Sequence, residues 1–287
     1  MDSSTFDYAT AFSRNVGWIT EAEQGLLGSK RVAIAGMGGV GGFHLLTLAR
    51  LGVQHFHIAD LDEFELANFN RQAGASMHTL GRHKAEALAE MALDINPQAE
   101  IQIYSQGVNR QNLGEFFAGV DLYVDGLDFF AFEAREQVFA YCHAHGIPAT
   151  TVAPLGMSAA LLNFLPGRMS FEGYFQLQGR PELEKAVRFL VGLAPNALHR
   201  HYLADRSRVN LAERRGPSTV MACSLCAGVA GTEALKILLG RGRVRAAPSG
   251  MQFDAYRNRL SHTWRPGGNG HPLNRLAIAV AKRMLGL

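Results

Sequence analysis

The sequence predicts an α/β protein built on a doubly wound, mostly parallel sheet with a C-terminal antiparallel extension. Short β-rich runs alternate with amphipathic helical stretches through the first half, and a glycine-rich turn joins the first run to the first helix. Two further β-rich runs follow each other closely near the C-terminus. Strands that alternate with helices pair in parallel through right-handed crossovers and are covered on both faces.

In the first half, each expected strand is a short apolar run and each expected helix has apolar residues at helical spacing. Gly52 and Gly146 end two of the helices, and Asn96-Pro97 ends another, because the residue before a proline avoids the helical region. The expected strands are residues 31–36, 55–60, 101–104, 122–125 and 149–152, and the expected helices are residues 40–51, 82–94, 112–118 and 133–145.

After Pro154 this alternation stops. Ser218 or Thr219 is expected to cap a long, nearly uncharged helix. The expected elements here are a strand at residues 159–165, helices at 182–192, 220–239 and 275–287, and a hairpin of 251–254 with 260–264. The last helix is cationic and amphipathic, which predicts docking of its apolar face on the protein's own surface, with contact to a membrane surface as the alternative. That face contains Leu273, Leu276, Ala277, Val280, Met284 and Leu287.

Composition narrows the class of protein. The chain has 287 residues, of which 47% are hydrophobic and 18% charged, so disorder and collagen-like repeats are excluded as its main organisation. Three cysteines are too few for a disulfide framework and indicate a reducing compartment. Neither a secretory signal nor a run of about 18 uninterrupted apolar residues is visible. We therefore expect a soluble, cytoplasmic protein without a membrane span.

The formal charge of +3 is too small to indicate nucleic-acid binding by itself. Between residues 196 and 217, however, five arginines face only two acidic residues, so this segment carries the whole net charge. An acidic peptide tail, an RNA or a small carboxylate would suit it, and so would a solvated loop without a ligand. Few aromatic residues accompany the arginines, which weakens the case for RNA stacking.

The glycine-rich turn predicts a nucleotide site. Gly36, Gly38, Gly39 and Gly41 follow the first strand and open the first helix, where backbone N–H groups can approach a phosphate at the helix N-terminus. Asp60 ends the second strand, 19 residues beyond Gly41, where a carboxylate can accept hydrogen bonds from ribose hydroxyls. These features alone fit an NAD-dependent oxidoreductase as well.

Three later residues favour a triphosphate over a dinucleotide. Arg71 and Lys84 place two cations on the nucleotide side of the sheet, and Asp128 follows the fourth strand. A dinucleotide has little use for both cations, whereas ATP with Mg²⁺ needs fixed positive charge and a carboxylate that holds the metal.

With these residues in order, the sequence resembles the adenylating enzymes related to ThiF, MoeB and the ubiquitin-activating enzymes. The resemblance rests on the glycine turn, Asp60, the stretch Asn68-Phe69-Asn70-Arg71-Gln72, Lys84 and Asp128, with intervals of 11, 13 and 44 residues from Asp60 onward. The stretch from Gly228 onward in the long late helix is also similar to the family's late helix. The likeness is strong over about residues 10–165 and moderate over 218–260.

The resemblance implies an ATP-dependent adenylyltransferase that joins a carboxylate to AMP and releases pyrophosphate. The four glycines, Asp60, Asn68 and Gln72 would bind ATP. Arg71 and Lys84 would neutralise the phosphates, and Asp128 would hold Mg²⁺. Arg14 would reach into the partner's ATP site, which implies a homodimer. The substrate would be the C-terminus of a ubiquitin-like sulfur carrier, a peptide or a small acid.

On this interpretation the chain divides into four parts. Residues 1–30 form a helical arm that contacts the dimer partner, and residues 31–165 form the ATP-binding core. Residues 166–219 form a basic crossover segment for the substrate. Residues 220–287 complete the same domain with a helix, a hairpin and the amphipathic helix.

Two features depart from the family. The crossover segment has no cysteine, and the single pair Cys223 and Cys226 lacks the second pair that the family's zinc needs, so no structural zinc is expected. Buried packing is favoured for this pair over a reactive thiol or a metal ligand. The aromatic run after Asp128, Phe129-Phe130-Ala131-Phe132, is interpreted either as helix packing or as a remodelled substrate pocket.

Other functions remain as alternatives. Within the family, a dehydratase that activates a carboxylate on a tRNA nucleoside would use the basic segment. An NAD-dependent oxidoreductase leaves Arg71, Lys84 and Asp128 unexplained. A nucleotide-binding subunit without catalysis is disfavoured by the presence of Asp128.

Overall fold

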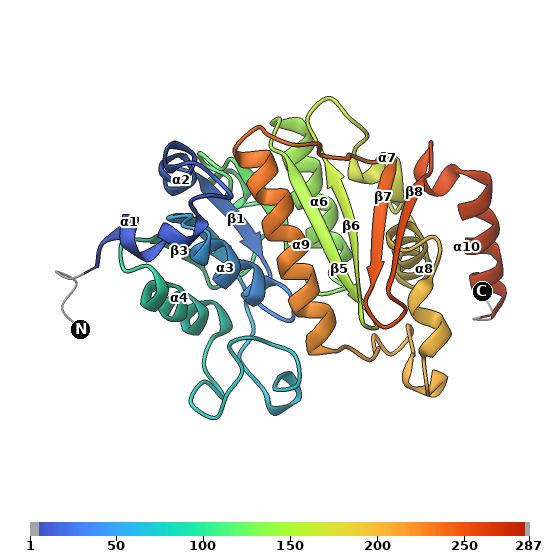
Figure 1. The fold of residues 1–287 in the computed structure, drawn as a ribbon. Coiled ribbons are helices and arrows are strands. Elements are labelled where there is room, and N and C mark those ends of the chain that lie inside the picture. The colour runs from blue at the N-terminus through green and yellow to red at the C-terminus, as the bar shows by residue number, and fades with distance from the viewer. Residues whose placement is uncertain (1–5, 285–287) are drawn as a thin grey trace. The chain divides into compact units, whose positions relative to one another are not determined.

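The structure, a computed structural model, describes residues 6–284. It divides into two compact units: Met1–Leu127 with Ala227–Val244, and Asp128–Cys226 with Arg245–Leu287. Figure 1 labels most of the elements of both.

The first unit contains four parallel strands in the order β3-β2-β1-β4. They are β1 (Arg31–Ala35), β2 (His55–Ala59), β3 (Glu100–Tyr104) and β4 (Leu122–Asp125). Val32, Ala33 and Ile34 of β1 are completely buried, as expected for a parallel strand covered on both faces. The chain leaves β1 toward β2 and later returns to the other side of β1 as β4. The carboxyl ends of β1 and β4 therefore form the switch point at which open α/β sheets bind ligands.

Helices of the first unit follow the predicted alternation (Figure 1). They are α1 (Tyr8–Ala11), α2 (Glu21–Gly28), α3 (Gly41–Arg50), α4 (Lys84–Ile95), α5 (Leu113–Phe116) and the later part of α9 (Val220–Leu238). Thr20 and Glu23 form a capping box at the start of α2. The α3 and α4 helices lie side by side, and α3 buries Leu45 and Leu48. This packing fixes the helix that starts at the glycine turn.

The glycine turn between β1 and α3 is tightly packed against the end of β4. A Cβ at Gly36, where φ is +86°, would lie 2.2 Å from the carbonyl oxygen of Gly126. A Cβ at Gly41 would lie 1.7 Å from the carbonyl oxygen of Gly36. Both positions therefore exclude any side chain, and the turn can take only this course because glycine occupies them.

The second unit contains four antiparallel strands in the order β5-β6-β7-β8. They are β5 (Ala149–Leu155), β6 (Ser158–Phe164), β7 (Ser249–Asp254) and β8 (Arg259–Trp264), and the helices are α6 (Phe132–Ala144), α7 (Phe171–Phe175), α8 (Glu182–Leu193) and α10 (Pro272–Met284). Phe139, Phe164, Phe171, Phe175 and Phe189 contact one another in an aromatic cluster between these elements. The fold class predicted from the sequence is confirmed: parallel strands alternate with helices, and antiparallel strands follow.

Two features of the second unit differ from the prediction made from the sequence. The α7 helix was not predicted, because a five-residue helix shows no periodicity; Ser170 caps it and its aromatic side chains are buried in the cluster. The prediction for the last helix was wrong in its orientation. Leu273, Leu276 and Val280 are 52–63% exposed, whereas Asn274 and Ile278 are buried. Met284 and Leu287 belonged to the same predicted face; the side chain of the first and the whole of the second lie outside the described part of the chain.

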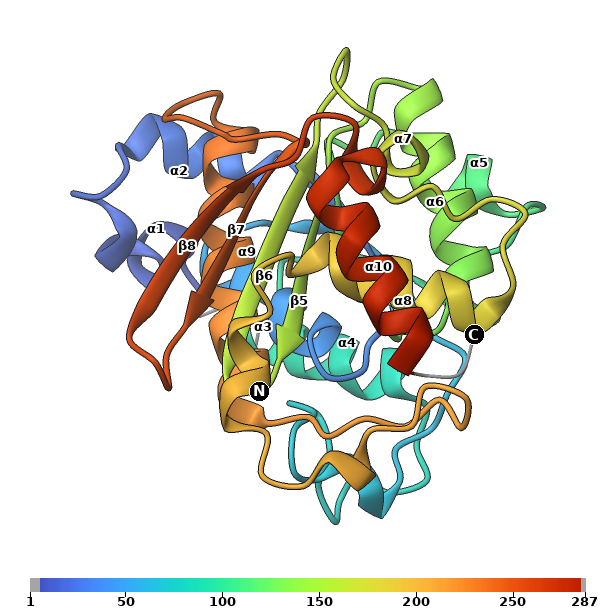
Figure 2. The ribbon, with the colours of Figure 1, turned by 90° about the vertical axis from the view of Figure 1, so that its right-hand side faces the viewer.

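Polar contacts explain how α10 is oriented. Asn274 donates through Nδ2 to the carbonyl oxygen of Gly268 and to Oδ1 of Asn269, each at 3.3 Å. Lys282 donates to Glu184 of α8 at 2.8 Å. Figure 2 shows α10 beside α8. These polar partners, and not the leucine stripe, determine which face of α10 turns inward.

The α9 helix carries both cysteines of the late pair. Thr219 accepts a hydrogen bond from the Ala222 N–H and so caps the helix, as predicted. Cys223 and Cys226 are completely buried, and burial raises the pKa of the Cys226 thiol well above its usual range. The α9 helix is long and apolar enough to cross a membrane by length and composition, but 44% of it is buried, so it is weak evidence for a span.

Replacement of Gly41 should destabilise the protein, since the Cβ of alanine has no room. We expect Gly41→Ala to lower the free energy of unfolding by more than about 2 kcal/mol, measured by urea denaturation. The matched control is Gly25→Ala in α2, where a Cβ meets nothing within 4 Å. It should raise stability by roughly 0.5–1 kcal/mol through helix propensity. Equal, small effects of both changes would contradict the packing described for the turn.

Glu184 should contribute to stability in a pH-dependent manner. Hydrogen bonds from Lys282 and then Arg188 hold the pKa of its carboxyl below the ordinary value of 4.5. Because the folded pKa is the lower one, the stabilisation is complete above pH 4.5 and is lost as pH falls through the folded pKa. Glu184→Gln should therefore cost about 1–3 kcal/mol at pH 7 and less at pH 3, where the carboxyl is more protonated. Glu133→Gln, at an exposed position of α6, should change little at either pH; a pH-independent loss at Glu184 would disprove the role of its charge.

Candidate functional site

Asp60 ties the end of β2 to the glycine turn. Its Oδ2 accepts a hydrogen bond from the Met37 N–H at 2.5 Å, and its Oδ1 accepts one from the Asp62 N–H at 2.8 Å. Burial raises the pKa of the Asp60 carboxyl, while these two hydrogen bonds and the charge of Lys84 oppose the rise. Both carboxylate oxygens of Asp60 therefore accept hydrogen bonds from backbone N–H groups. The contact with ribose hydroxyls that the sequence predicted stays a prediction.

Lys84 provides a buried cation beside this carboxylate. It is the first residue of α4 and only 6% exposed. Its Nζ lies 2.9 Å from Oδ2 of Asp62, and its N–H donates to the carbonyl oxygen of Asp62 at the same distance. The sequence predicted Lys84 as a phosphate ligand but did not predict Asp62 as its partner. That partner sits in the Ala-Asp-Leu-Asp stretch, two residues after Asp60.

Gln72 brings an unpartnered acceptor to the glycine turn. Its side chain is buried, and its Oε1 has no hydrogen-bond partner in the part of the chain that the structure describes. Its Nε2 lies 3.6 Å from the place that a Cβ on Gly38 would occupy. Because unpaired buried acceptors are costly, this amide is suited to a ligand group that donates a hydrogen bond beside the turn.

Asn68 and Arg71 stand on the segment that leads to Gln72. Asn68 ends the short helix η3 (Leu66–Asn68) and accepts the Glu65 N–H through Oδ1 at 3.0 Å, so its side chain holds the segment in place. Arg71 donates through Nη1 to the carbonyl oxygen of Ala67 and to Oδ1 of Asn70, each at 2.9 Å. Its Nε and Nη2 donate to no acceptor within residues 6–284, which leaves them available to an anion.

Arg14 and Asp128 are the two remaining residues that the sequence predicted for the site. Arg14 belongs to η2 (Ser13–Asn15), is exposed, and has no side-chain partner among the described residues. Asp128 is the first residue of the second unit and is exposed; its Oδ1 accepts the Phe130 N–H at 2.9 Å. Its Oδ2 accepts no hydrogen bond from the described chain. The structure therefore brings the glycines, Asp60, Lys84 and Gln72 together in the first unit. The roles predicted for Arg14 and for Asp128 stay predictions.

Arg135 supports Asp128, and the sequence reasoning missed this. The guanidinium is buried in α6 and donates to the carbonyl oxygens of Asp128 and Phe129 at 3.0 and 3.3 Å. It also stands 4.7 Å from the ring centroid of Phe189. Phe129 and Phe132 contact the same ring, at 5.2 and 5.8 Å between centroids. The aromatic run after Asp128 is thus packed against α8, and an arginine seven residues after the aspartate was its only sequence signal.

His44 lies inside α3 as a neutral side chain. It is completely buried, and neither ring nitrogen has a partner among residues 6–284. Burial lowers the pKa of His44 to about 4, although the charge of Asp125 opposes the shift. The ring is therefore uncharged near neutral pH, and the sequence carried no signal for this beyond a histidine in the first helix.

The residues present suit ATP and Mg²⁺ in different degrees. The turn opens at a helix N-terminus, where backbone N–H groups suit a nucleotide phosphate. The unpartnered Oε1 of Gln72 beside it suits a hydrogen-bond donor of the nucleotide. In the described chain there is no group of three or more His, Cys, Asp or Glu side chains that could hold a metal. Magnesium does not need one, since it is commonly bound by one or two carboxylates together with substrate phosphates and water. Asp128, with Oδ2 unengaged, fits that mode.

Comparisons with known proteins find relatives of about half of this chain. The tRNA threonylcarbamoyladenosine dehydratase of Escherichia coli (strain K12) is 29% identical over 132 residues, which cover 46% of this chain and 48% of that protein. The Sulfur carrier protein ThiS adenylyltransferase of the same organism is 29% identical over 146 residues, covering 51% and 57%. The chain thus spans about half the length of the curated relatives it matches.

A solved structure is similar to this chain in fold over most of its length. The crystal structure of E. coli MccB with ATP aligns with a TM-score of 0.66 at 19% identity, over 91% of this chain and 72% of that one. A model described as the ThiF family matches residues 12–272, a range that includes the glycine turn, Asp60, Arg71, Lys84 and Asp128. Because the match covers most of the sequence, and the fold and the glycine turn agree with it, the chain belongs to the ThiF family.

Proposed function

We propose that this protein is an ATP-dependent adenylyltransferase that activates a carboxylate as an acyl-adenylate. The observation that carries the proposal is the grouping of an anion-binding turn, the unpartnered Gln72 acceptor and the buried Lys84 cation at one end of the parallel strands. The relatives support it, since one is named an adenylyltransferase and the structurally similar MccB was solved with ATP.

The proposed reaction joins the substrate to AMP. A carboxylate oxygen attacks the α-phosphorus of ATP, a new O–P bond forms, and the bond from the α-phosphorus to the bridging oxygen breaks as pyrophosphate leaves. Negative charge then grows on the leaving phosphates, where Lys84 and the free donors of Arg71 would stabilise it. Asp60 would keep the turn in register for the nucleotide through the Met37 N–H. Magnesium held by Asp128 would supply further positive charge on the phosphates.

Several parts of the proposal concern partners. The substrate would be the C-terminus of a ubiquitin-like sulfur carrier, a peptide or a small acid. A homodimer would allow the exposed Arg14 of one protomer to complete the ATP site of the other. The protein would act in the cytoplasm. An NAD-dependent oxidoreductase is disfavoured, because binding of a dinucleotide does not explain the presence of Arg71, Lys84 and Asp128.

The nucleotide preference can be tested by thermal denaturation. A ligand at 100 times its Kd adds about 2.7 kcal/mol of stability. Mg-ATP should therefore raise the Tm, ATP with EDTA should raise it less, and NAD and NADP should have little effect. Asp128→Ala should remove the magnesium-dependent part of the shift, whereas Asp205→Ala, which also removes an exposed aspartate of the second unit, should retain it.

Catalysis is then measured as exchange of pyrophosphate into ATP with a panel of carboxylates. We expect Asp128→Ala to lower the exchange rate at least about a hundredfold, because charge on the transferring phosphoryl group is no longer offset. Near-normal exchange by this variant, or stabilisation by NAD but not by ATP, would refute the proposal.

A tRNA dehydratase is the second candidate, favoured by the relatives of that name and by the basic segment. Arg206, Arg208, Arg214 and Arg215 are all exposed. Three of them pair with nearby carboxylates, at 3.2–3.6 Å. Such exposed pairs contribute little and can open to contact phosphates.

If tRNA is the substrate, neutralising these four arginines to glutamine should weaken tRNA binding and reduce its dependence on salt. The slope of log K against log salt should fall by up to about 3. The control is the quadruple glutamine variant of the exposed Arg110, Arg168, Arg259 and Arg283. Filter binding at several salt concentrations compares the two; equal losses would indicate attraction without a defined RNA site and would remove the support for this candidate.

A further inference from the structure

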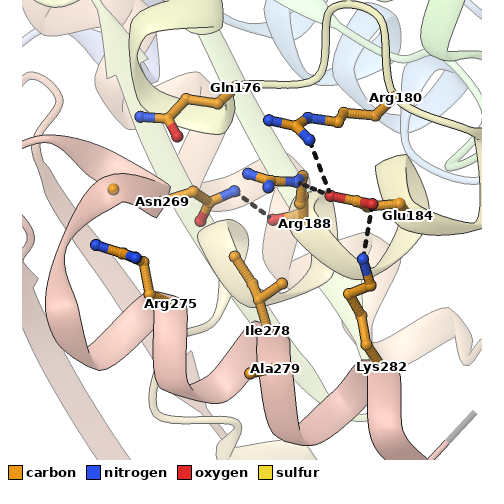
Figure 3. A pocket seen from close by; sticks show the side chains of 10 residues that line it. Gln176, Arg180, Glu184, Arg188, Asn269, Arg275, Ile278, Ala279 and Lys282 are labelled. Carbon is orange, nitrogen blue, oxygen red and sulfur yellow. Dashed lines mark hydrogen bonds and ion pairs between the residues drawn. The ribbon is translucent and has the colours of Figure 1, made fainter. Parts of the chain in front are cut away.

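The second unit contains a cavity of about 470 Å³ that the proposed reaction does not use. It lies between α8, α10 and the turn η6 (Gly268–Gly270) that precedes α10. Figure 3 shows its charged side chains: Arg180, Glu184, Arg188, Arg275 and Lys282. A cavity of this volume is within the usual range for small-molecule sites.

Positive charge dominates the cavity. Its lining contains four cations and one carboxylate, Glu184. Glu184 accepts hydrogen bonds from Arg188 Nε and Lys282 Nζ, both at 2.8 Å, and lies 3.8 Å from Arg180 Nη1. One carboxylate cannot neutralise four cations, so a net charge of about +3 remains at the lining.

Guanidinium donors remain free to contact a ligand. Arg188 uses only Nε on Glu184, and its side chain is 13% exposed, so its two Nη groups face the cavity without an acceptor in the described chain. The Arg275 side chain has no partner among residues 6–284. In Figure 3 Arg180 and Arg188 each turn one nitrogen to Glu184 and their other nitrogens toward Gln176, and Arg275 borders the opposite side. Paired N–H groups in this geometry suit the oxygens of phosphate or carboxylate groups.

The floor of the cavity is fixed before any ligand arrives. Asn269 is buried and donates through Nδ2 to the carbonyl oxygens of Phe175 and Arg188, at 2.7 and 2.9 Å. It also accepts from Asn274 of α10 through Oδ1. The backbone of Arg188 and the start of α10 are therefore held together, and little conformational freedom is lost when an anion binds.

We propose that this cavity is a binding site for an oxyanion with two or more negative charges, either a phosphorylated compound or a polycarboxylate. The site is built from the second unit alone, by residues that the adenylation proposal does not involve. The proposal of an anion site is therefore independent of whether the chain adenylates a carboxylate.

Calorimetric titration of the full chain with inorganic pyrophosphate and, separately, with citrate at constant ionic strength tests the proposal and distinguishes the two sources. The variant Arg180→Gln/Arg275→Gln removes two exposed cations from the cavity, and Arg168→Gln/Arg283→Gln removes two exposed cations elsewhere in the same unit. We expect saturable binding of at least one probe, weakened about tenfold or more by the first variant and less than twofold by the second.

Glu184→Gln supplies an effect of the opposite sign. Removal of the competing carboxylate releases donors of Arg188 and Lys282, so the probe that binds should bind several-fold more tightly. Thermal denaturation of each variant confirms that it is folded before it is titrated. The proposal is overturned if neither probe binds saturably, or if both double variants lose affinity equally. Binding that is unchanged in both, as expected for pyrophosphate held only at the glycine turn, would also overturn it for that probe.

Discussion

The first unit depends on a close approach of backbone that only glycine permits. Gly36 and Gly41 bring the β1–α3 turn against the residues that follow β4, at distances where a Cβ would overlap a carbonyl oxygen. The turn is then held from the other side by the hydrogen bond from Met37 to Asp60 at the end of β2. Three strand ends are thus connected at one point. The same point sets the N-terminus of α3, and Asp60 links it through the Asp62 N–H to the carboxylate that pairs with Lys84.

Charge is arranged differently in the two units. In the first unit the buried cation Lys84 has a dedicated carboxylate, Asp62, and Asp60 is occupied by backbone N–H groups. In the second unit the cavity has four cations and one carboxylate, Glu184, which contacts only three of them. A paired buried cation keeps its position when no ligand is present, whereas an excess of cations attracts an anion from solution. The paired Lys84 of the first unit is therefore suited to orienting a substrate phosphate. The excess of cations in the second unit is suited to binding an anion from solution.

Membership of the ThiF family leaves the substrate open. The curated relatives include enzymes named for a tRNA nucleoside and for a sulfur carrier protein, and the chain spans about half the length of each. The nucleotide end of the site can be argued from residues that the family model covers. On the proposed function, the acceptor would be recognised by the aromatic run after Asp128 and by the basic segment, and in both this sequence departs from the family. Packing of Phe129 and Phe132 on Phe189 accounts for much of that aromatic run without a ligand.

The sequence by itself determined the fold class and the position of the glycine turn, and it narrowed the cap of α9 to Ser218 or Thr219, of which the structure uses Thr219. These depend on local patterns: alternation of strand and helix, glycines where no side chain fits, and a hydroxyl before a helix. The sequence also predicted Asp60, Arg71 and Lys84 at one sheet edge, because parallel strands end together. The structure places Lys84 close enough to act on Asp60, and the position of Arg71 at a phosphate stays a prediction. The sequence did not reveal Asp62 as the partner of Lys84, Arg135 beneath Asp128, or α7.

Tertiary structure alone decided those contacts and the orientation of α10. The leucine stripe of α10 predicted the wrong inward face, because Asn274 and Lys282 found polar partners on η6 and α8. The cavity between α8 and α10 could not be predicted from the sequence either, because its arginines come from segments almost a hundred residues apart. Periodicity records where apolar side chains recur along one element, but hydrogen bonds between distant elements depend on which residues the fold brings together.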